Sequence, residues 1–204
     1  MIALVLAAAA SVVATDTPQG FRTGPAKAPR TLVEYGSLNC PHCAHFSSFG
    51  TAEILQRVRS GKLAFEYRPY MIFPQDIPAT LIAKCVPAGR KFGFIEEYYR
   101  NVDAIRQRLQ ATDRAALDAV REAGVPAMNR KLVEIGQMKP IAARFGLTGT
   151  AVDQCVSDPA RLKWLEGIQE AAKAAGVSGT PTFQLNGQKV ELDNVEALRA
   201  ALDK

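Results

Sequence analysis

The strongest constraint on the fold is the order of its segments, because sheet-forming sequence stands at both ends of a long helical block. Thr31–Tyr35 is a β-favouring run, a helix pattern starts at Cys40, and residues 63–72 alternate as a second strand does. Near the C-terminus, two short strand patterns over residues 182–192 flank an Asn-Gly pair typical of a hairpin turn, and a last helix follows. This order predicts an α/β protein whose sheet is assembled from two distant parts of the chain.

Residues 77–176 carry apolar side chains at three- and four-residue steps, the period of amphipathic helices. The clearest predicted helix begins at the N-cap Asp158 and ends at Gly176. Other helices are expected over residues 77–86, 93–109, 112–123, 128–137 and 150–156. The block is therefore predicted to be a helical domain inserted into a sheet domain formed by residues 20–76 and 177–204.

The composition is that of an ordinary globular protein. Of the 204 residues, 48% are hydrophobic and 22% charged, which is enough apolar material for one full core. The formal net charge is +5, but basic and acidic residues are interleaved, as in Arg114, Asp118, Arg121 and Glu122. Since no basic stripe follows one segment, we expect no nucleic-acid partner.

The N-terminal residues have the pattern of an export signal. Residues 2–14 are uncharged and almost entirely apolar, and the sequence turns polar at Thr15. As a helix this run spans roughly 20 Å, which is short against the ~30 Å hydrocarbon layer of a bilayer. Small or branched residues end the run, where a signal peptidase reads the chain. We expect residues 1–14 to be a signal peptide and a short linker to run from Thr15 to about Arg22, although a buried strand or helix is the alternative.

Export changes what the cysteines mean, because disulfides form in oxidising compartments. Cys40, Cys43, Cys85 and Cys155 allow three pairings. The Cys-Pro-His-Cys spacing brings Cys40 and Cys43 onto one helical turn, which leaves Cys85 and Cys155 for each other. Two separate buried thiols are the alternative for this second pair.

The Cys40-Pro41-His42-Cys43 motif stands where a strand pattern gives way to a helix, and Pro41 suits the first helical position. Cys40 is then expected beside free backbone N–H groups at the positive end of the helix dipole, which favour its thiolate. His42, protonated or donating an N–H, adds positive character beside the same sulfur. A stabilised thiolate favours the reduced form, so the corresponding disulfide is a stronger oxidant.

Two other uses of this motif are open on chemical grounds. Zinc needs more ligands than the motif supplies, and His42 and His45 are the only histidines, so no metal is expected. An inert disulfide is the second alternative, in which case the chain is a chaperone-like binding module with structural disulfides. Replacing Cys40 leaves the activity of such a module intact.

Two motifs together resemble those of the DsbA-type oxidoreductases of the thioredoxin fold. The first is Leu32-Val33-Glu34-Tyr35 leading into Cys40-Pro41-His42-Cys43, which looks like the family's active site. The second is Gly179-Thr180-Pro181-Thr182-Phe183, which is similar to its cis-proline loop. The helical block also lies where this family inserts its helical domain. The resemblance covers nearly the whole chain from about Arg22 and implies a thioredoxin-like α/β fold with an inserted α-helical domain.

The resemblance also implies roles for single residues. Cys40 is expected to be the exposed nucleophile, Cys43 the buried resolving thiol, and His42 the group that stabilises the Cys40 thiolate. Pro181 is expected to follow a cis peptide bond, and the backbone of Thr180 to pair with substrate beside the disulfide.

Two further features of the family bear on buried groups. Glu34, six positions before Cys40, matches a buried acid that moves a proton to or from the resolving thiol, with a partly exposed strand carboxylate as the alternative. Some alphaproteobacterial members resemble this chain in carrying a second disulfide, which implies a structural Cys85–Cys155 bridge.

The function implied is that of a periplasmic protein thiol:disulfide oxidoreductase. It is expected to donate the Cys40–Cys43 disulfide to reduced exported proteins, to need no cofactor and to act as a monomer. A quinone-linked membrane protein of the DsbB kind is expected to reoxidise it. A disulfide isomerase or reductase of the same fold is the alternative, because thioredoxin-fold isomerases also place threonine before the proline, as Thr180 does here.

Overall fold

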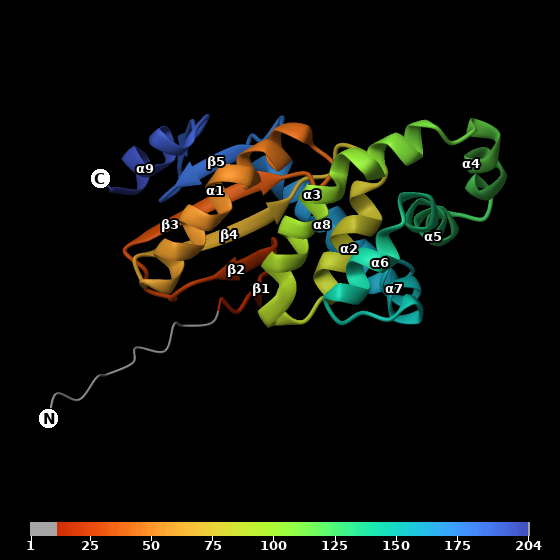
Figure 1. Ribbon diagram of the computed structural model, residues 1–204, viewed down its shortest axis with the longest axis horizontal. Coiled ribbons are helices and arrows are strands. Elements are labelled where there is room, and N and C mark those ends of the chain that lie inside the picture. The colour runs from red at the N-terminus through yellow and green to blue at the C-terminus, as the bar shows by residue number, and fades with distance from the viewer. Residues whose placement is uncertain (1–11, 204) are drawn as a thin grey trace, which may run out of the picture.

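The computed structural model describes residues 12–203, with a mixed sheet toward one end of the molecule and a cluster of helices toward the other (Figure 1). The strands are β1 Thr15–Asp16, β2 Phe21–Thr23, β3 Arg30–Gly36, β4 Leu63–Pro69, β5 Thr182–Leu185 and β6 Gln188–Val190. The helices are α1 Pro41–Arg59, α2 Asp76–Cys85, the 3₁₀ turn η1 Ala88–Arg90, α3 Lys91–Gln110, α4 Arg114–Arg121, α5 Val125–Gly136, α6 Met138–Arg144, α7 Gly149–Cys155, α8 Pro159–Ala174 and α9 Val195–Asp203. None of the helices over residues 12–203 has the length and apolar character that a membrane crossing needs.

The sheet has the strand order β1-β2-β4-β3-β5-β6, and β3 is where the two distant halves of the chain meet. β3 pairs in parallel with β4, which it reaches through the crossover helix α1, and antiparallel with β5. Glu34 stands in the middle of this arrangement, opposite Tyr67 of β4 and Phe183 of β5. The predicted α/β architecture, with helices inserted between two sheet-forming parts, is confirmed.

The two faces of β3 carry different cores, because successive side chains point to opposite sides of a strand. Leu32 belongs to the large core that includes the buried face of α1. Val33 and Tyr35 form a smaller core with Ala172 of α8 on the other face. The alternation therefore places Glu34 on the face of the sheet that α1 covers, where the Cys43 thiol is also buried.

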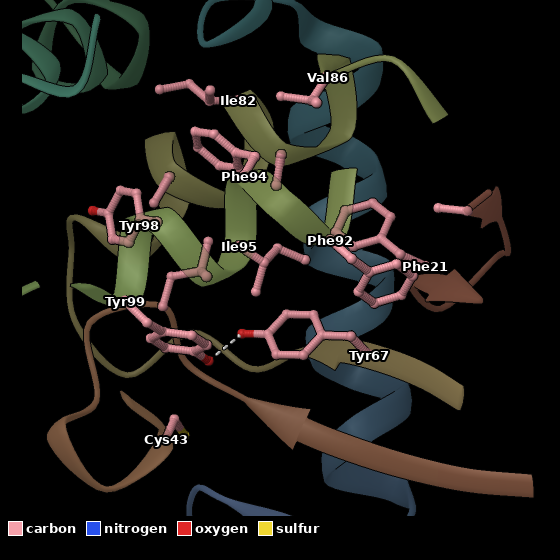
Figure 2. Close-up of a cluster of buried hydrophobic side chains, with 14 of the residues drawn as sticks. Phe21, Cys43, Tyr67, Ile82, Val86, Phe92, Phe94, Ile95, Tyr98 and Tyr99 are labelled. Atoms are coloured by element: carbon pink, nitrogen blue, oxygen red, sulfur yellow. Dashed lines mark hydrogen bonds between the residues drawn. The ribbon is translucent and has the colours of Figure 1, made fainter. Parts of the chain in front are cut away.

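The large core runs without interruption from the sheet into the helical block. Figure 2 shows Phe92 and Phe94 of α3 among the side chains that fill this junction. The Phe92 ring lies 5.6 Å from that of Phe65 on β4, and the hydroxyl groups of Tyr67 and Tyr99 are 2.9 Å apart. The sheet and the inserted helices therefore share one apolar interior.

The prediction of a linker between Thr15 and about Arg22 is wrong, because this segment is part of the sheet. Residues 15–16 and 21–23 are strands, and β2 pairs antiparallel with β4. Phe21 is fully buried, and Asp16 forms ion pairs with Lys84 at 3.2 Å and Lys91 at 2.8 Å. Strands this short have too few residues to show a period, so only their pairing in the folded sheet defines them.

Ala14, the last residue of the predicted signal peptide, packs against the fold. It is 3% exposed, and its N–H donates to the carbonyl oxygen of Ala88 at 3.0 Å. Residues 1–11 of that predicted segment lie outside the described residues.

Candidate active site

Cys40 is the N-cap residue of α1, and Pro41 occupies the first helical position as the sequence indicates. The backbone of Cys40 is extended, with φ −85° and ψ 122°, and no side chain caps the helix. The first turn of α1 contains no acidic residue. The N–H groups at the start of the helix are therefore available to the Cys40 sulfur, and nothing negative in that turn competes with it.

The surroundings of Cys40 lower its pKa from 9.0 to about 5. The largest cause is the hydrogen bond from the Cys43 thiol, and burial opposes it. The backbone N–H groups of Cys43 and His42 lower the pKa further. Cys40 is therefore a thiolate at neutral pH when the pair is reduced, and both cysteines are free thiols in this structure.

The expected exposure of Cys40 is not found. Cys40 is only 4% exposed and Cys43 is fully buried. The loop before Pro181 covers the nucleophile, because the Cys40 Sγ atom lies 3.4 Å from the carbonyl oxygen of Thr180. The Thr180–Pro181 peptide bond is cis.

His42 contributes through its backbone. Its N–H is one of the groups that lower the pKa of Cys40. Its side chain is exposed, and none of the hydrogen bonds found over residues 12–203 involves the imidazole. The proposed action of the imidazole on the thiolate stays a prediction.

Cys43 and Glu34 are buried together on the α1 face of β3. Burial is the main cause that raises the pKa of the Cys43 thiol, and the neighbouring Cys40 and Glu34 raise it further. Glu34 is 5% exposed, so the alternative of a partly exposed carboxylate is wrong. Burial, and then the charge of the Cys40 thiolate, raises the pKa of Glu34 from 4.5 to about 8. Glu34 can therefore hold a proton near neutral pH.

The carboxyl of Glu34 is not committed to a structural bond. Its Oε1 atom is buried and has no hydrogen-bond partner among the residues that the structure describes. Buried polar atoms are usually paired, and unpaired ones in native structures call for an explanation such as a role in proton transfer. The position of Glu34 is compatible with the proton-moving role that the family resemblance implies, which stays a prediction.

A pair of buried tyrosines, Tyr67 of β4 and Tyr99 of α3, lies beside the site, and sequence reasoning did not assign them to it. The hydroxyl of Tyr99 also donates to the carbonyl oxygen of Ser37 at 3.3 Å. Figure 2 shows Tyr99 between Cys43 and its partner Tyr67. Gly36 allows the close approach, since a Cβ atom there would lie 2.6 Å from the Tyr67 ring. Burial raises the pKa of both tyrosines, so they stay neutral beside the thiols.

A groove of about 550 Å³ runs between α1 and α3 and starts beside the motif. Pro41 and His45 line its end near the nucleophile, and Glu96 and Asp103 of α3 line the opposite wall. Its volume lies within the range of ordinary ligand sites.

Cys85 and Cys155 form the second disulfide that the resemblance implied. The bond joins the ends of α2 and α7 within the helical block, and the Cα atoms of the two cysteines are 6.4 Å apart.

No three His, Cys, Asp or Glu side chains among residues 12–203 are grouped closely enough to hold a metal ion.

The chain belongs to the thioredoxin family, whose model matches residues 16–204. Its fold is more specifically that of the DsbA-type proteins, a thioredoxin fold with an inserted helical block. The crystal structure of a protein-disulfide isomerase from Novosphingobium aromaticivorans superposes with a TM-score of 0.79 at 27% identity, over 90% of this chain and 97% of that chain. The Wolbachia pipientis alpha-DsbA1 structure has a TM-score of 0.70 at 20% identity, over 92% and 91% of the two chains, and this likeness concerns the fold alone.

Two curated relatives from Rickettsia are named as protein-disulfide oxidoreductases. A Rickettsia bellii protein assigned by name to the protein-disulfide oxidoreductases is 29% identical over 176 residues, which cover 85% of this chain and 59% of the relative. A Rickettsia prowazekii protein with the same assignment is 28% identical and matches over 85% of this chain and 56% of its own length. The chain thus spans less than two thirds of the length of these relatives.

Proposed function

We propose that this chain is a periplasmic protein thiol:disulfide oxidoreductase that donates the Cys40–Cys43 disulfide to reduced exported proteins. The observation that carries the proposal is the Cys40 sulfur at the start of α1, whose pKa is lowered to about 5. A thiolate of such low pKa is a good leaving group, and it makes the reduced enzyme the favoured product. The names of the Rickettsia and Novosphingobium proteins support the same class of reaction.

The reaction transfers two electrons from a substrate dithiol to the enzyme disulfide. A substrate thiolate attacks the Cys40 Sγ atom, the bond between Cys40 and Cys43 breaks, and the Cys43 sulfur leaves as a thiolate. Glu34 gives that thiolate its proton, which fits the raised pKa of both groups. A second substrate thiolate then attacks the first substrate sulfur, and Cys40 leaves as the stabilised thiolate. The substrate gains a disulfide, and the enzyme ends reduced, with Cys40 as a thiolate and Cys43 as a thiol. Of the two protons that the substrate thiols lose to solvent, one is balanced by the proton that Glu34 regains.

The loop before Pro181 and the groove between α1 and α3 flank the nucleophile. The Thr180 backbone faces Cys40 and is proposed to pair with the substrate backbone next to the reacting sulfur. The groove that Pro41 and His45 border is proposed to hold the neighbouring residues of the substrate. Backbone pairing suits an enzyme that must accept many sequences, because it does not depend on particular side chains.

Turnover needs a second protein, because each cycle leaves Cys40 and Cys43 reduced. A quinone-linked membrane protein of the DsbB kind is proposed to reoxidise them, and the chain is proposed to act as a monomer. Removal of residues 1–14 as a signal peptide is proposed to accompany export. Expression in a bacterium with a periplasm, followed by cell fractionation, N-terminal sequencing and light scattering, tests these points. A periplasmic monomer that begins near Thr15 is expected, and a cytoplasmic chain that keeps residues 1–14 contradicts export.

A disulfide isomerase is the second candidate, and the name of the Novosphingobium structure favours it. The reduction potential of the Cys40–Cys43 pair, equilibrated in glutathione buffers, separates the two functions. An oxidase is expected above about −180 mV, and a value near −270 mV contradicts oxidation of substrates. A peptide-dithiol oxidation assay beside a scrambled-ribonuclease assay gives the balance of the two activities. Cys40→Ser is expected to abolish both, whereas a chaperone-like binding module keeps its activity without the thiol.

A further inference from the structure

Asp76 is a buried carboxylate that the reaction above does not use. It is the first residue of α2 and is 1% exposed. One oxygen, Oδ1, accepts from the Ser37 hydroxyl, the Asn39 N–H and the Asn39 amide, each at 2.9 Å. The other, Oδ2, accepts from the Ser37 hydroxyl at 2.8 Å and from the N–H groups of Ile72 at 2.8 Å and Phe73 at 2.9 Å. Among residues 12–203, every hydrogen-bond partner of this carboxyl group is a neutral donor.

Two of these partners control where the nucleophile sits. Ser37 and Asn39 belong to the turn between β3 and α1, and Asn39 directly precedes Cys40. The N–H of Cys40 in turn donates to the carbonyl oxygen of Ser37 at 3.1 Å. Since no side chain caps α1, the path of this turn fixes the Cys40 sulfur relative to the first N–H groups of the helix.

The other partners lie where the chain leaves the sheet for the helical block. Ile72 and Phe73 precede α2, and the neighbouring Met71 is held on both sides by the Gln169 amide of α8. Its N–H donates to Gln169 at 2.9 Å, and its carbonyl accepts from Gln169 at 3.3 Å. Asp76 therefore links the turn before Cys40 to residues 71–73. That segment is bonded through Met71 to α8, the helix that packs on the face of the sheet away from α1.

The chemistry of the site requires a carboxylate. Backbone N–H groups and the Asn39 amide can only donate to Asp76, and the Tyr98 hydroxyl bonds the Asn39 Oδ1 atom at 3.3 Å, which orients that amide. An asparagine at position 76 would turn its own NH₂ group toward the N–H groups of Ile72 and Phe73 or toward those of Asn39. Either way, buried donors would face each other unpaired, which costs about 1–3 kcal/mol for each group.

We propose that Asp76 is a positioning residue for the nucleophile, because it holds the turn of Ser37–Asn39 so that the Cys40 sulfur faces the start of α1. The proposal concerns the reactivity of Cys40 itself and holds whether the chain oxidises or isomerises disulfides. The direction in which the pKa of Cys40 changes on substitution distinguishes this positioning role from a purely electrostatic one. Loss of a nearby negative charge alone would lower the pKa of Cys40, whereas loss of the position raises it.

The test measures the pH dependence of Cys40 alkylation by iodoacetamide in the reduced full chain, with the modified cysteine identified by mass spectrometry. Asp76→Asn is expected to raise the pKa of Cys40 by about one unit and to slow alkylation at pH 5 several-fold. Cys43, whose thiol lowers the pKa of Cys40 most, and Glu34, whose own pKa responds to the Cys40 thiolate, are unchanged in this variant. An unchanged or lowered pKa of Cys40 in folded Asp76→Asn overturns the proposal.

Two more variants keep the test decisive. Ile82→Ala removes a fully buried side chain of α2 that takes no part in these hydrogen bonds, so it lowers stability and is expected to leave the alkylation profile unchanged. A shift in Ile82→Ala equal to that in Asp76→Asn would show that general loosening is the cause, and would overturn the proposal. Ser37→Ala removes the hydroxyl that donates to Asp76 and accepts from the Asn39 N–H at 3.2 Å, but leaves the carboxyl of Asp76 and its other donors in place. It is expected to shift the pKa of Cys40 in the same direction by less. If Asp76→Asn does not fold, an unshifted Ser37→Ala overturns the proposal in its place.

Discussion

The Cys40 Sγ atom lies 3.4 Å from the carbonyl oxygen of Thr180, a residue 140 positions further along the chain. The two groups come from opposite sides of the helical block, and they meet because β3 pairs with β5. The sheet, rather than the local sequence, therefore holds the nucleophile against the loop that is proposed to bind substrate. The contact between Cys40 and Thr180 is therefore where the reactive sulfur meets the loop proposed to bind substrate.

The reduced protein is expected to be more stable than the protein with the Cys40–Cys43 disulfide. The pKa of Cys40 is lowered to about 5, so its thiolate stabilises the reduced fold. This contribution is fully present above the unfolded pKa, near 9, and is lost as the pH falls through about 5. Thermal unfolding of both forms, in a Cys85→Ala/Cys155→Ala background, should give the higher Tm to the reduced form at pH 7 and a narrower gap at pH 4. A higher Tm for the oxidised form at pH 7 would contradict this account.

Glu34→Gln is expected to stabilise the fold at high pH. The pKa of Glu34 is raised from 4.5 to about 8, so the protonated form favours folding below pH 4.5 and this contribution is lost as the pH rises through 8. Glutamine keeps the shape without the charge, so at pH 9 the variant should gain about 2–4 kcal/mol over the wild type.

Urea unfolding of Glu34→Gln and the wild type between pH 4 and pH 9 measures this difference. The two stability curves should run together at low pH and diverge above pH 5. Disulfide exchange by the variant should also be slower, because no carboxyl is left to protonate the Cys43 thiolate. Parallel stability curves over the whole range would show that Glu34 is not perturbed as described.

How far the sequence could predict the fold depends on the length and regularity of each element. The long elements, such as α1 and α8, follow from apolar periodicity, N-caps and glycine ends. β1 and β2 are too short to have a period. The helix α6 follows α5 directly at Gln137, a non-glycine residue whose φ of 53° is left-handed. Gly136 and Pro140 stand on either side of this break, but the sequence does not show that a second helix begins at Met138.

The site could be predicted only where a residue type carries its chemistry with it. Cys40 and Cys43 are found from their spacing, and Pro181 from the resemblance. Asp76 at the start of a helix resembles any acidic residue in a first turn, and only the folded structure shows that its partners come from two other loops. The prediction that Cys40 is exposed was also wrong, because the loop at Thr180 that covers it lies 140 positions away in the sequence.

The Cys85–Cys155 bond is expected to support the helical block without taking part in exchange. It closes a span of 70 residues. Its removal in Cys85→Ala/Cys155→Ala should lower the free energy of unfolding by about 2–4 kcal/mol. Urea unfolding and peptide oxidation, measured on the same samples, check both parts. Lost oxidation in a folded double variant would give this bond a part in the reaction.

His42→Ala is expected to make the reduction potential of the pair more reducing, by less than about 30 mV. The backbone N–H that acts on Cys40 survives the substitution, and the imidazole is exposed, so only a screened contribution is removed. Equilibration with glutathione, with His45→Ala as the matched control on the same helix, measures the change. A potential equal to that of the wild type would assign the whole effect of His42 to its backbone.

The most direct test is a titration of the Cys40 thiol by its thiolate absorbance near 240 nm, with reduced protein compared with oxidised protein. A single transition near pH 5 is predicted, because the start of α1 and the Cys43 thiol hold the charge of the sulfur. Absence of any thiolate below pH 8 would show that Cys40 is an ordinary thiol, and would contradict the proposed catalyst.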